Sequence, residues 1–202
     1  MGPRGRFVAF EGGEGTGKST QAAIAAQRLD GLLTREPGGT EVGERVRSLV
    51  LDSALHIDDR AEALLMAAAR AQHVAEVIEP ALALGRDVVT DRFTGSSLAY
   101  QGIARGLGVE EVMALSTFAT AGLVPDAVIL LDLPPAISST RLTGAPDRME
   151  RAGVAFHQRV ADGFRSLAAG DPSWTVVDAH GTVEDVAARV AMVLDAMDRE
   201  TP

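Results

Sequence analysis

Short apolar runs alternate along the chain with longer segments in which apolar residues recur every three or four positions. The short runs have the length of buried strands, and we expect strands at residues 6–10, 32–34, 87–90, 127–131 and 174–177. The longer segments have the period of amphipathic helices, and we expect helices at residues 19–29, 61–84, 109–121 and 183–197. Strands that alternate with helices predict an α/β fold, with a five-stranded parallel sheet and helices on both of its faces.

The length of 202 residues and the apolar content of 46% fit one well-buried core, and residues 1–202 show no repeat, linker or domain boundary. No apolar run approaches the roughly 18 residues of a membrane span. The first residues lead into a strand without the apolar segment of a signal peptide. We therefore expect one domain, located in the cytoplasm and not associated with a membrane.

The net charge of −9 argues against a nucleic acid polymer as partner, because such binding depends on a basic surface. A small anionic substrate needs only a local cluster of cations and remains open. The chain has no cysteine, and its four histidines lack the spacing of metal ligands. Neither thiol chemistry nor a zinc or haem site is expected.

The segment between the first expected strand and helix matches the phosphate-binding pattern G-x-x-x-x-G-K-[ST] at every required position. Its residues are Gly12, Gly13, Glu14, Gly15, Thr16, Gly17, Lys18 and Ser19. Backbone N–H groups of such a loop and the N-terminus of the following helix hold phosphate oxygens. Lys18, the only lysine of the chain, would contact the β- and γ-phosphates, and the Ser19 hydroxyl would bind Mg²⁺. The loop predicts binding of a nucleoside triphosphate with Mg²⁺.

The loop alone does not define the reaction. A GTPase needs the guanine-reading pattern [NT]-K-x-D, and this chain has neither an asparagine nor a second lysine. That class is excluded, whereas a motor or switch ATPase remains open. A kinase would differ from such an ATPase in having a second site for a phosphorylated substrate.

Charged residues directly follow four of the expected strands. They are Glu11, Arg35 with Glu36, Asp91 with Arg92, and Asp132. In a parallel sheet, these positions meet at the edge where ligands bind. The planar fork of arginine suits a phosphate group, and a neighbouring carboxylate such as Asp91 can bind a metal ion through water. Surface salt bridges are the alternative explanation for Arg35 and Arg92.

Five segments follow one another along the chain: Glu11-Gly12, TREPGGT at 34–40, Asp91-Arg92-Phe93, SSLAYQG at 96–102 and DRME at 147–150. Together they resemble the bacterial thymidylate kinases over essentially the whole chain. The resemblance implies a P-loop kinase fold with a small lid and, through its helices, a homodimer. It also implies that the chain transfers the γ-phosphoryl group of Mg-ATP to dTMP, giving dTDP and ADP in dTTP biosynthesis.

The resemblance implies a binding site for dTMP made of Arg35, Met66, Arg70, Arg92, Ser97, Tyr100 and Gln101. Arg35 and Arg92 would hold the phosphate group of dTMP. Arg70 would lie against the base or the phosphate. Glu14 occupies the position where relatives have an acidic residue near the metal ion and the acceptor phosphate.

The base and the sugar of dTMP have their own implied contacts. Ser97 and Gln101 would hydrogen-bond the edge of thymine. Met66 stands where the family has a phenylalanine that stacks on thymine, one helical turn before Arg70. Tyr100 would stand where a ribose 2′-OH would collide, which favours deoxyribose; packing between helices is the alternative explanation for this tyrosine.

Position 15 separates two types of relatives, because one type has an arginine there and the other supplies arginines from a mobile lid. This chain has Gly15 and resembles the second type. The expected lid spans residues 140–151, with a hinge at Gly144-Ala145-Pro146 and with Arg141, Arg148 and Arg151. These arginines would stabilise charge on the transferring group. Lys18, Glu14 and Arg92 complete the expected catalytic residues.

Two alternatives stay open. A kinase for another monophosphate or for a deoxynucleoside is separated from this assignment only by the family pattern and by Ser97, Tyr100 and Gln101. A non-catalytic nucleotide-binding module is more distant, because Arg35, Arg92 and the lid arginines count against it. No strong general base is expected in the kinase, since the acceptor phosphate oxygen is already anionic near neutral pH.

Overall fold

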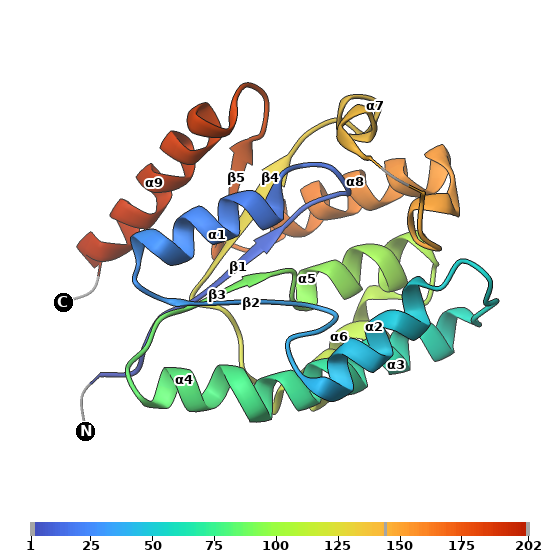
Figure 1. The fold of residues 1–202 in the computed structure, drawn as a ribbon, viewed down its shortest axis with the longest axis horizontal. Helices are drawn as coiled ribbons and strands as arrows, with labels where there is room; N and C mark the ends of the chain where they lie inside the picture. Colours follow the sequence, from blue (N-terminus) through green and yellow to red (C-terminus); the bar gives the residue numbers. More distant parts are fainter. Residues whose placement is uncertain (1–2, 144, 201–202) are drawn as a thin grey trace.

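A parallel sheet of five strands lies at the centre of the structure (Figure 1). The strands are Phe7–Glu11 (β1), Leu32–Arg35 (β2), Val88–Asp91 (β3), Ala127–Asp132 (β4) and Trp174–Asp178 (β5), in the order β2-β3-β1-β4-β5. This is a computed structural model, and it describes residues 3–143 and 145–200. All five expected strands are confirmed, with ends displaced by at most one residue.

Helices connect the strands and cover the sheet. The α-helices are Lys18–Arg28 (α1), Glu41–Leu51 (α2), Asp59–His73 (α3), Glu79–Ala83 (α4), Thr94–Ser97 (α5), Val109–Thr120 (α6), Pro135–Ser138 (α7), Val154–Gly170 (α8) and Val183–Glu200 (α9). The π-helical segments Val74–Ile78 (η1) and Leu98–Ala104 (η2) extend α3 and α5, and short 3₁₀ turns lie at Ser139–Arg141 (η3) and Glu150–Ala152 (η4). The helix predicted at 61–84 is therefore the continuous run of α3, η1 and α4. Within the described residues, no helix is both long and apolar enough to cross a membrane.

Two apolar layers hold the helices against the sheet. On β1, Val8 and Phe10 pack with residues of α1 and α9, whereas Phe7 and Ala9 pack on the other face with residues of η1 and α4. Figure 1 shows α1 and α9 on one side of the sheet and α4 on the other. Because β1 is buried on both faces, its sequence is a continuous apolar run rather than an alternating one. A third cluster joins η2 and α8 around Tyr100, Phe156 and Phe164.

The register of the strands brings their carboxyl ends together. Asp91 is paired with Phe10 on one side and with Arg35 on the other, so the ends of β1, β2 and β3 meet at one edge of the sheet. Asp132, the fourth charged strand end, instead forms an ion pair of 2.9 Å with Arg165 of α8. The site is therefore built around β1, β2 and β3.

Candidate active site

The phosphate-binding loop at residues 12–17 connects β1 to α1. Its glycines include Gly12, Gly15 and Gly17 with φ angles of +141°, +71° and +93°. A Cβ atom at position 15 would lie 2.2 Å from the carbonyl oxygen of Ser138, so a larger residue would clash with the backbone. Gly17 precedes α1 and has no side chain to cap the first N–H groups of the helix, which leaves these groups to an anion.

Lys18 is buried beside the loop. Its Nζ atom donates a hydrogen bond of 2.6 Å to the carbonyl oxygen of Gly13. Burial and the charge of Arg92 lower the pKa of Lys18 to about 8. Phosphate oxygens in the loop would favour the charged ammonium again, because opposite charges nearby stabilise it.

Arg92 ties the end of β3 to the phosphate-binding loop. Its Nη2 atom lies 2.7 Å from Glu14 Oε1, and its Nη1 atom donates to the carbonyl oxygen of Gly12 at 3.0 Å. The Tyr100 hydroxyl donates to the same Glu14 oxygen at 2.8 Å. Burial by itself would raise the pKa of Glu14, but the charges of Arg92 and Lys18 outweigh it and lower the pKa to about 2. Glu14 is therefore a carboxylate at neutral pH.

Ser19 and Asp91 form the part of the site that fits a divalent cation. The Ser19 hydroxyl donates to Asp91 Oδ2. Asp91 Oδ1 is buried and has no hydrogen-bond partner within the described part of the chain, so an acceptor oxygen remains for a cation or its water. Residues 3–143 and 145–200 contain no cluster of three or more metal-ligating side chains. The oxygens of Ser19 and Asp91 suit Mg²⁺, because this ion usually takes one or two protein oxygens and completes its shell with phosphates and water.

A cavity opens beside Arg92 and Glu14, lined mainly by α2, α3 and residues 92–101. Its apolar wall includes Leu51, Met66, Phe93 and Met149, and its polar groups include Glu36, Arg70, Ser97, Tyr100 and Gln101. Apolar walls with a few polar groups are typical of a site for a small molecule. Six of the seven residues expected to bind dTMP therefore line one cavity.

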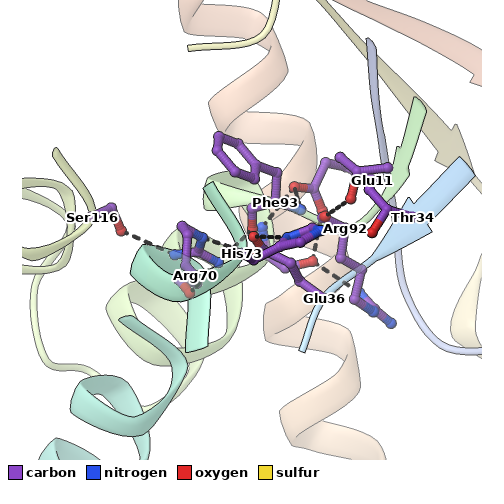
Figure 2. A network of polar contacts seen from close by, with 11 residues as sticks. Glu11, Thr34, Glu36, Arg70, His73, Arg92, Phe93 and Ser116 are labelled. Carbon is purple, nitrogen blue, oxygen red and sulfur yellow. Dashed lines mark hydrogen bonds and ion pairs between the residues drawn. The ribbon is translucent and has the colours of Figure 1, made fainter. Parts of the chain in front are cut away.

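A buried polar network holds Arg70 at this cavity (Figure 2). Arg70 Nε donates to Glu36 Oε2 at 2.7 Å, and Arg70 Nη2 donates to the carbonyl oxygen of Phe93 at 2.9 Å. The other oxygen of Glu36 lies 3.0 Å from His73 Nδ1, and His73 Nε2 lies 2.6 Å from the Thr34 hydroxyl. Because these side chains are buried and connected, the guanidinium of Arg70 has a defined orientation.

Glu11 fixes the loop that carries Arg92. It accepts hydrogen bonds from the backbone N–H groups of Phe93 and Ser96, both at 3.0 Å, and from the Ser96 hydroxyl at 2.6 Å. Burial raises the pKa of Glu11 to about 7, against the lowering effect of these hydrogen bonds and of Arg92. The carboxyl group therefore titrates near neutral pH, unlike Glu14.

Arg35 is the one expected acceptor residue outside this cavity. It lines a neighbouring cavity together with Lys18, Asp91 and Arg92. Its guanidinium pairs with Glu44 at 2.9 Å, and both side chains are about half exposed. Of these two cavities, Met66 lines only the first and Lys18 only the second, so Arg35 lies on the side of the phosphate-binding loop rather than on the side of Met66.

A further cavity of about 610 Å³ extends from the phosphate-binding loop to the loop before α9. Residues 14–21, Arg141 and residues 181–183 line it. The guanidinium of Arg141 contacts the carbonyl oxygen of Ala179 at 3.3 Å. Of the three arginines expected in a lid, Arg141 is the one that the described structure places at this cavity.

The other lid arginines contact different groups. Arg148 donates to the carbonyl oxygen of Val50 at 2.7 Å and to Glu62 at 2.5 Å. Arg151 donates to the carbonyl oxygen of Pro146 at 3.0 Å. Gly144, the first residue of the expected hinge, lies outside the described residues.

Arg47 lines the cavity of Met66 and Arg70, and Glu62 binds Arg148, but no motif points to either residue. Glu36 is expected from the sequence only as a charged strand end, and its pairing with Arg70 is not. One signal could have found Glu62, because it precedes Met66 and Arg70 by one and two helical turns and so shares their face of α3. For Arg47 the sequence offers no comparable signal. Its place in the cavity depends on how α2 packs.

Comparisons with known proteins agree with this geometry. The family model "Thymidylate kinase" matches residues 10–190. A thymidylate kinase of Rhizorhabdus wittichii is 48% identical over 94% of this chain and 97% of its own, and one of Bifidobacterium longum is 49% identical over 92% and 95%. The crystal structure of thymidylate kinase from Ehrlichia chaffeensis superposes with a TM-score of 0.80 at 30% identity and covers 95% of this chain and 100% of its own.

Proposed function

This chain belongs to the thymidylate kinase family, and we propose that it transfers the γ-phosphoryl group of Mg-ATP to dTMP, giving dTDP and ADP. One observation carries the proposal. Glu14 and Arg92 line the cavity of Met66 and Arg70, and Glu14 also lines the cavity that follows the phosphate-binding loop. Two substrates bound in these cavities would meet at Glu14 and Arg92, as direct transfer between two phosphates requires.

In this proposal dTMP binds in the cavity lined by Met66 and Arg70, which we call the acceptor cavity. Arg92 holds the acceptor phosphate and Arg35 reaches it from the neighbouring cavity. Arg70, Ser97 and Gln101 line the cavity with polar groups that can read the base, and the thioether of Met66 covers it. Tyr100 is held by Glu14 at the same cavity, where its ring restricts the space beside the sugar.

ATP binds in the cavity that extends from the phosphate-binding loop to the loop before α9, which we call the donor cavity. The backbone N–H groups of the phosphate-binding loop and Lys18 hold its phosphates. The Ser19 hydroxyl and Asp91 would hold Mg²⁺, which neutralises charge on the donor phosphates when bound. The ionised Glu14 keeps the guanidinium of Arg92 between the two phosphates. The acceptor phosphate oxygen attacks directly, so none of these residues has to act as a strong general base.

We propose Arg141 as the lid arginine that approaches the donor phosphates, since it lines the donor cavity. The backbone of Ser138 leaves no room for an arginine at position 15, which supports the lid type of the family. Arg148 and Arg151 would need to leave their partners to reach the phosphates. Exclusion of water by the lid would protect ATP from hydrolysis.

We also propose a homodimer in which α3 and α6 face a second copy of the chain. On α6, Phe118 is 89% exposed, Ala114 is exposed one helical turn before it, and Met113 is also exposed. On α3, which packs against α6, Leu64 is exposed. A second copy would remove these apolar side chains from water. We also propose, as expected from the sequence, that the enzyme acts in the cytoplasm.

Release of ADP from Mg-ATP by the purified protein tests the function. The acceptors to compare are dTMP, dUMP, the ribose analogue of dTMP, dCMP, dGMP and thymidine. A strong preference for dTMP is the expected result. Turnover with a different acceptor would contradict the assignment of the base-reading residues, and absence of ADP with every acceptor would contradict the kinase itself.

A further inference from the structure

Glu62 is a buried carboxylate to which the proposed reaction gives no role. It lies on α3, and its side chain is fully buried. It accepts hydrogen bonds from Gln101 Nε2 at 2.8 Å, from Arg148 Nη2 at 2.5 Å and from Arg105 Nη2 at 3.2 Å. Glu62 therefore joins the base of the lid to a residue that lines the acceptor cavity.

Two arginines keep Glu62 in its ionised form. Burial by itself would raise the pKa of Glu62, but the hydrogen bonds of Gln101 and Arg148 and the charge of Arg105 outweigh burial and lower the pKa below its usual value. An ionised carboxylate contains only acceptor atoms. The part of Gln101 that faces Glu62 is therefore the NH₂ group.

This contact decides what Gln101 offers to a ligand. The amide oxygen lies on the other side of the amide from the NH₂ group, and within the described part of the chain it has no hydrogen-bond partner. Because Gln101 lines the acceptor cavity, this oxygen is the atom left for a bound base. A carbonyl oxygen can accept a hydrogen bond but cannot donate one.

Pyrimidines differ in the group that would meet this oxygen. A pyrimidine with a 4-oxo group, such as thymine, has an N–H donor at ring position 3. A 4-aminopyrimidine has a lone pair at the same position and would place an acceptor against an acceptor. A buried pair of unmatched acceptors is unfavourable, so the orientation of the amide discriminates between the two classes.

We propose that Glu62 is a positioning residue that sets the orientation of the Gln101 amide and thereby selects pyrimidines with an N–H at position 3 over 4-aminopyrimidines. Arg105 and Arg148 support this role because they keep the carboxylate ionised. The inference rests on the proposed function, since it takes dTMP as the acceptor. It adds to that function the residue that determines how the base edge is read.

The substitution Glu62→Gln tests the proposal. The new carbonyl oxygen would face the two arginines, so the new NH₂ group would face Gln101 and require an acceptor there. The amide of Gln101 would turn, and its own NH₂ group would point into the cavity. We expect the ratio of kcat/KM for dTMP to kcat/KM for 5-methyl-dCMP to fall at least about tenfold, through the acceptor KM, while the KM for ATP stays unchanged.

A second variant exchanges the two residues, Glu62→Gln with Gln101→Glu. The carboxylate at position 101 can only accept, so this exchange should restore the preference for dTMP. The exchange also tests the proposal if Glu62→Gln alone is too unstable to purify. If the Gln101 amide instead donated a hydrogen bond to thymine, a carboxylate at position 101 could not replace it, and the exchange would lose dTMP binding. Loss of the dTMP preference in the exchange would overturn the proposal.

Glu76→Gln is the matched control, because Glu76 accepts a comparable hydrogen bond of 2.7 Å from Gln72 on the surface of the same helical run. It should leave the acceptor ratio unchanged. Equal losses for both acceptors in Glu62→Gln, with an unchanged ratio, would show a purely structural role and overturn the proposal. Failure of the proposed function is distinguishable, since the wild type itself would then show no preference for dTMP.

Discussion

Glu11 is buried and Glu14, three residues further along, is partly buried, yet their surroundings give them opposite ionisation. Glu14 lies against Arg92 and Lys18, whose charges lower its pKa to about 2. Glu11 is bound mainly by the uncharged donors of Phe93 and Ser96, and burial raises its pKa to about 7. Single residues at this site therefore act according to the charge of their nearest partners rather than according to their type.

The raised pKa of Glu11 predicts a pH-dependent stability. Between pH 4.5 and about 7 the folded state holds the proton of Glu11 more tightly than the unfolded state, so the contribution of Glu11 to stability is largest at low pH and is lost as the pH rises through 7. Glu11→Gln removes this titration. From pH 5 to pH 8, the unfolding free energy of the variant should rise relative to wild type by about 2–3 kcal/mol.

Urea unfolding at the two pH values, without nucleotide or metal, measures this difference. The exposed Glu76→Gln variant serves as the control and should follow the wild type at both pH values. A Glu11→Gln variant that also followed the wild type would show that Glu11 is already ionised at pH 5.

Lys18→Arg tests the phosphate-binding loop. Lys18 is buried and its ammonium is 2.6 Å from the backbone of Gly13, so a larger planar guanidinium has no space there although it keeps the charge. We expect kcat/KM to fall on the order of 10³-fold when ADP release is measured with dTMP as acceptor. Near-normal turnover would contradict the role assigned to Lys18.

At the scale of elements, the segment that follows β3 positions several residues of the site because it packs closely against the sheet. The segment after β3 turns at Arg92, which has a φ angle of +72°, and enters α5 against Glu11 and Trp174. The following π-helical segment η2 carries Tyr100 and Gln101. Small displacements of α5 would therefore move Arg92, Tyr100 and Gln101, which line the cavity proposed for dTMP.

Gly95→Ala tests this close packing. A Cβ atom at Gly95 would lie 2.6 Å from the ring of Trp174 and 2.8 Å from Glu11 Oε1. We expect a destabilisation of about 1–3 kcal/mol and a change in the fluorescence of Trp174, the only tryptophan of the chain. Gly170→Ala is the control, since a Cβ atom there has no heavy-atom neighbour within 4 Å in the described residues, and it should leave both properties near those of the wild type.

At the scale of the whole molecule, one edge of the sheet carries the cavities proposed for the two substrates, and α3 and α6 present an apolar surface. The donor and acceptor cavities meet at Glu14 on this edge. The apolar surface includes Phe118 and Met113 of α6 and Leu64 of α3. Because Arg70 of α3 contacts Ser116 of α6 at 3.4 Å, the proposed dimer helices also border the acceptor site.

Phe118→Asp tests the proposed dimer. A carboxylate at this exposed position would be costly to bury in an interface, so the molar mass measured by light scattering should fall to that of a single chain. Met192→Asp is the control, because Met192 is also exposed but lies on α9 at the other face of the sheet. An unchanged mass for Phe118→Asp would place the interface elsewhere or show that the chain is a monomer.

The sequence by itself determined the five strands, the phosphate-binding loop and the segments of the family. These features depend on local properties, such as apolar periodicity and a loop of eight consecutive residues, which neighbouring positions encode. The tertiary structure decided which polar groups meet. Glu36 pairs with Arg70 across 34 positions and Glu62 pairs with Arg148 across 86, so no local pattern specifies either contact. Arg141 and Arg148 both lie in the segment 140–151, and nothing in the sequence tells them apart. Only the packing of this segment places Arg141 at the cavity beside the phosphate-binding loop and Arg148 against the buried carboxylate of Glu62.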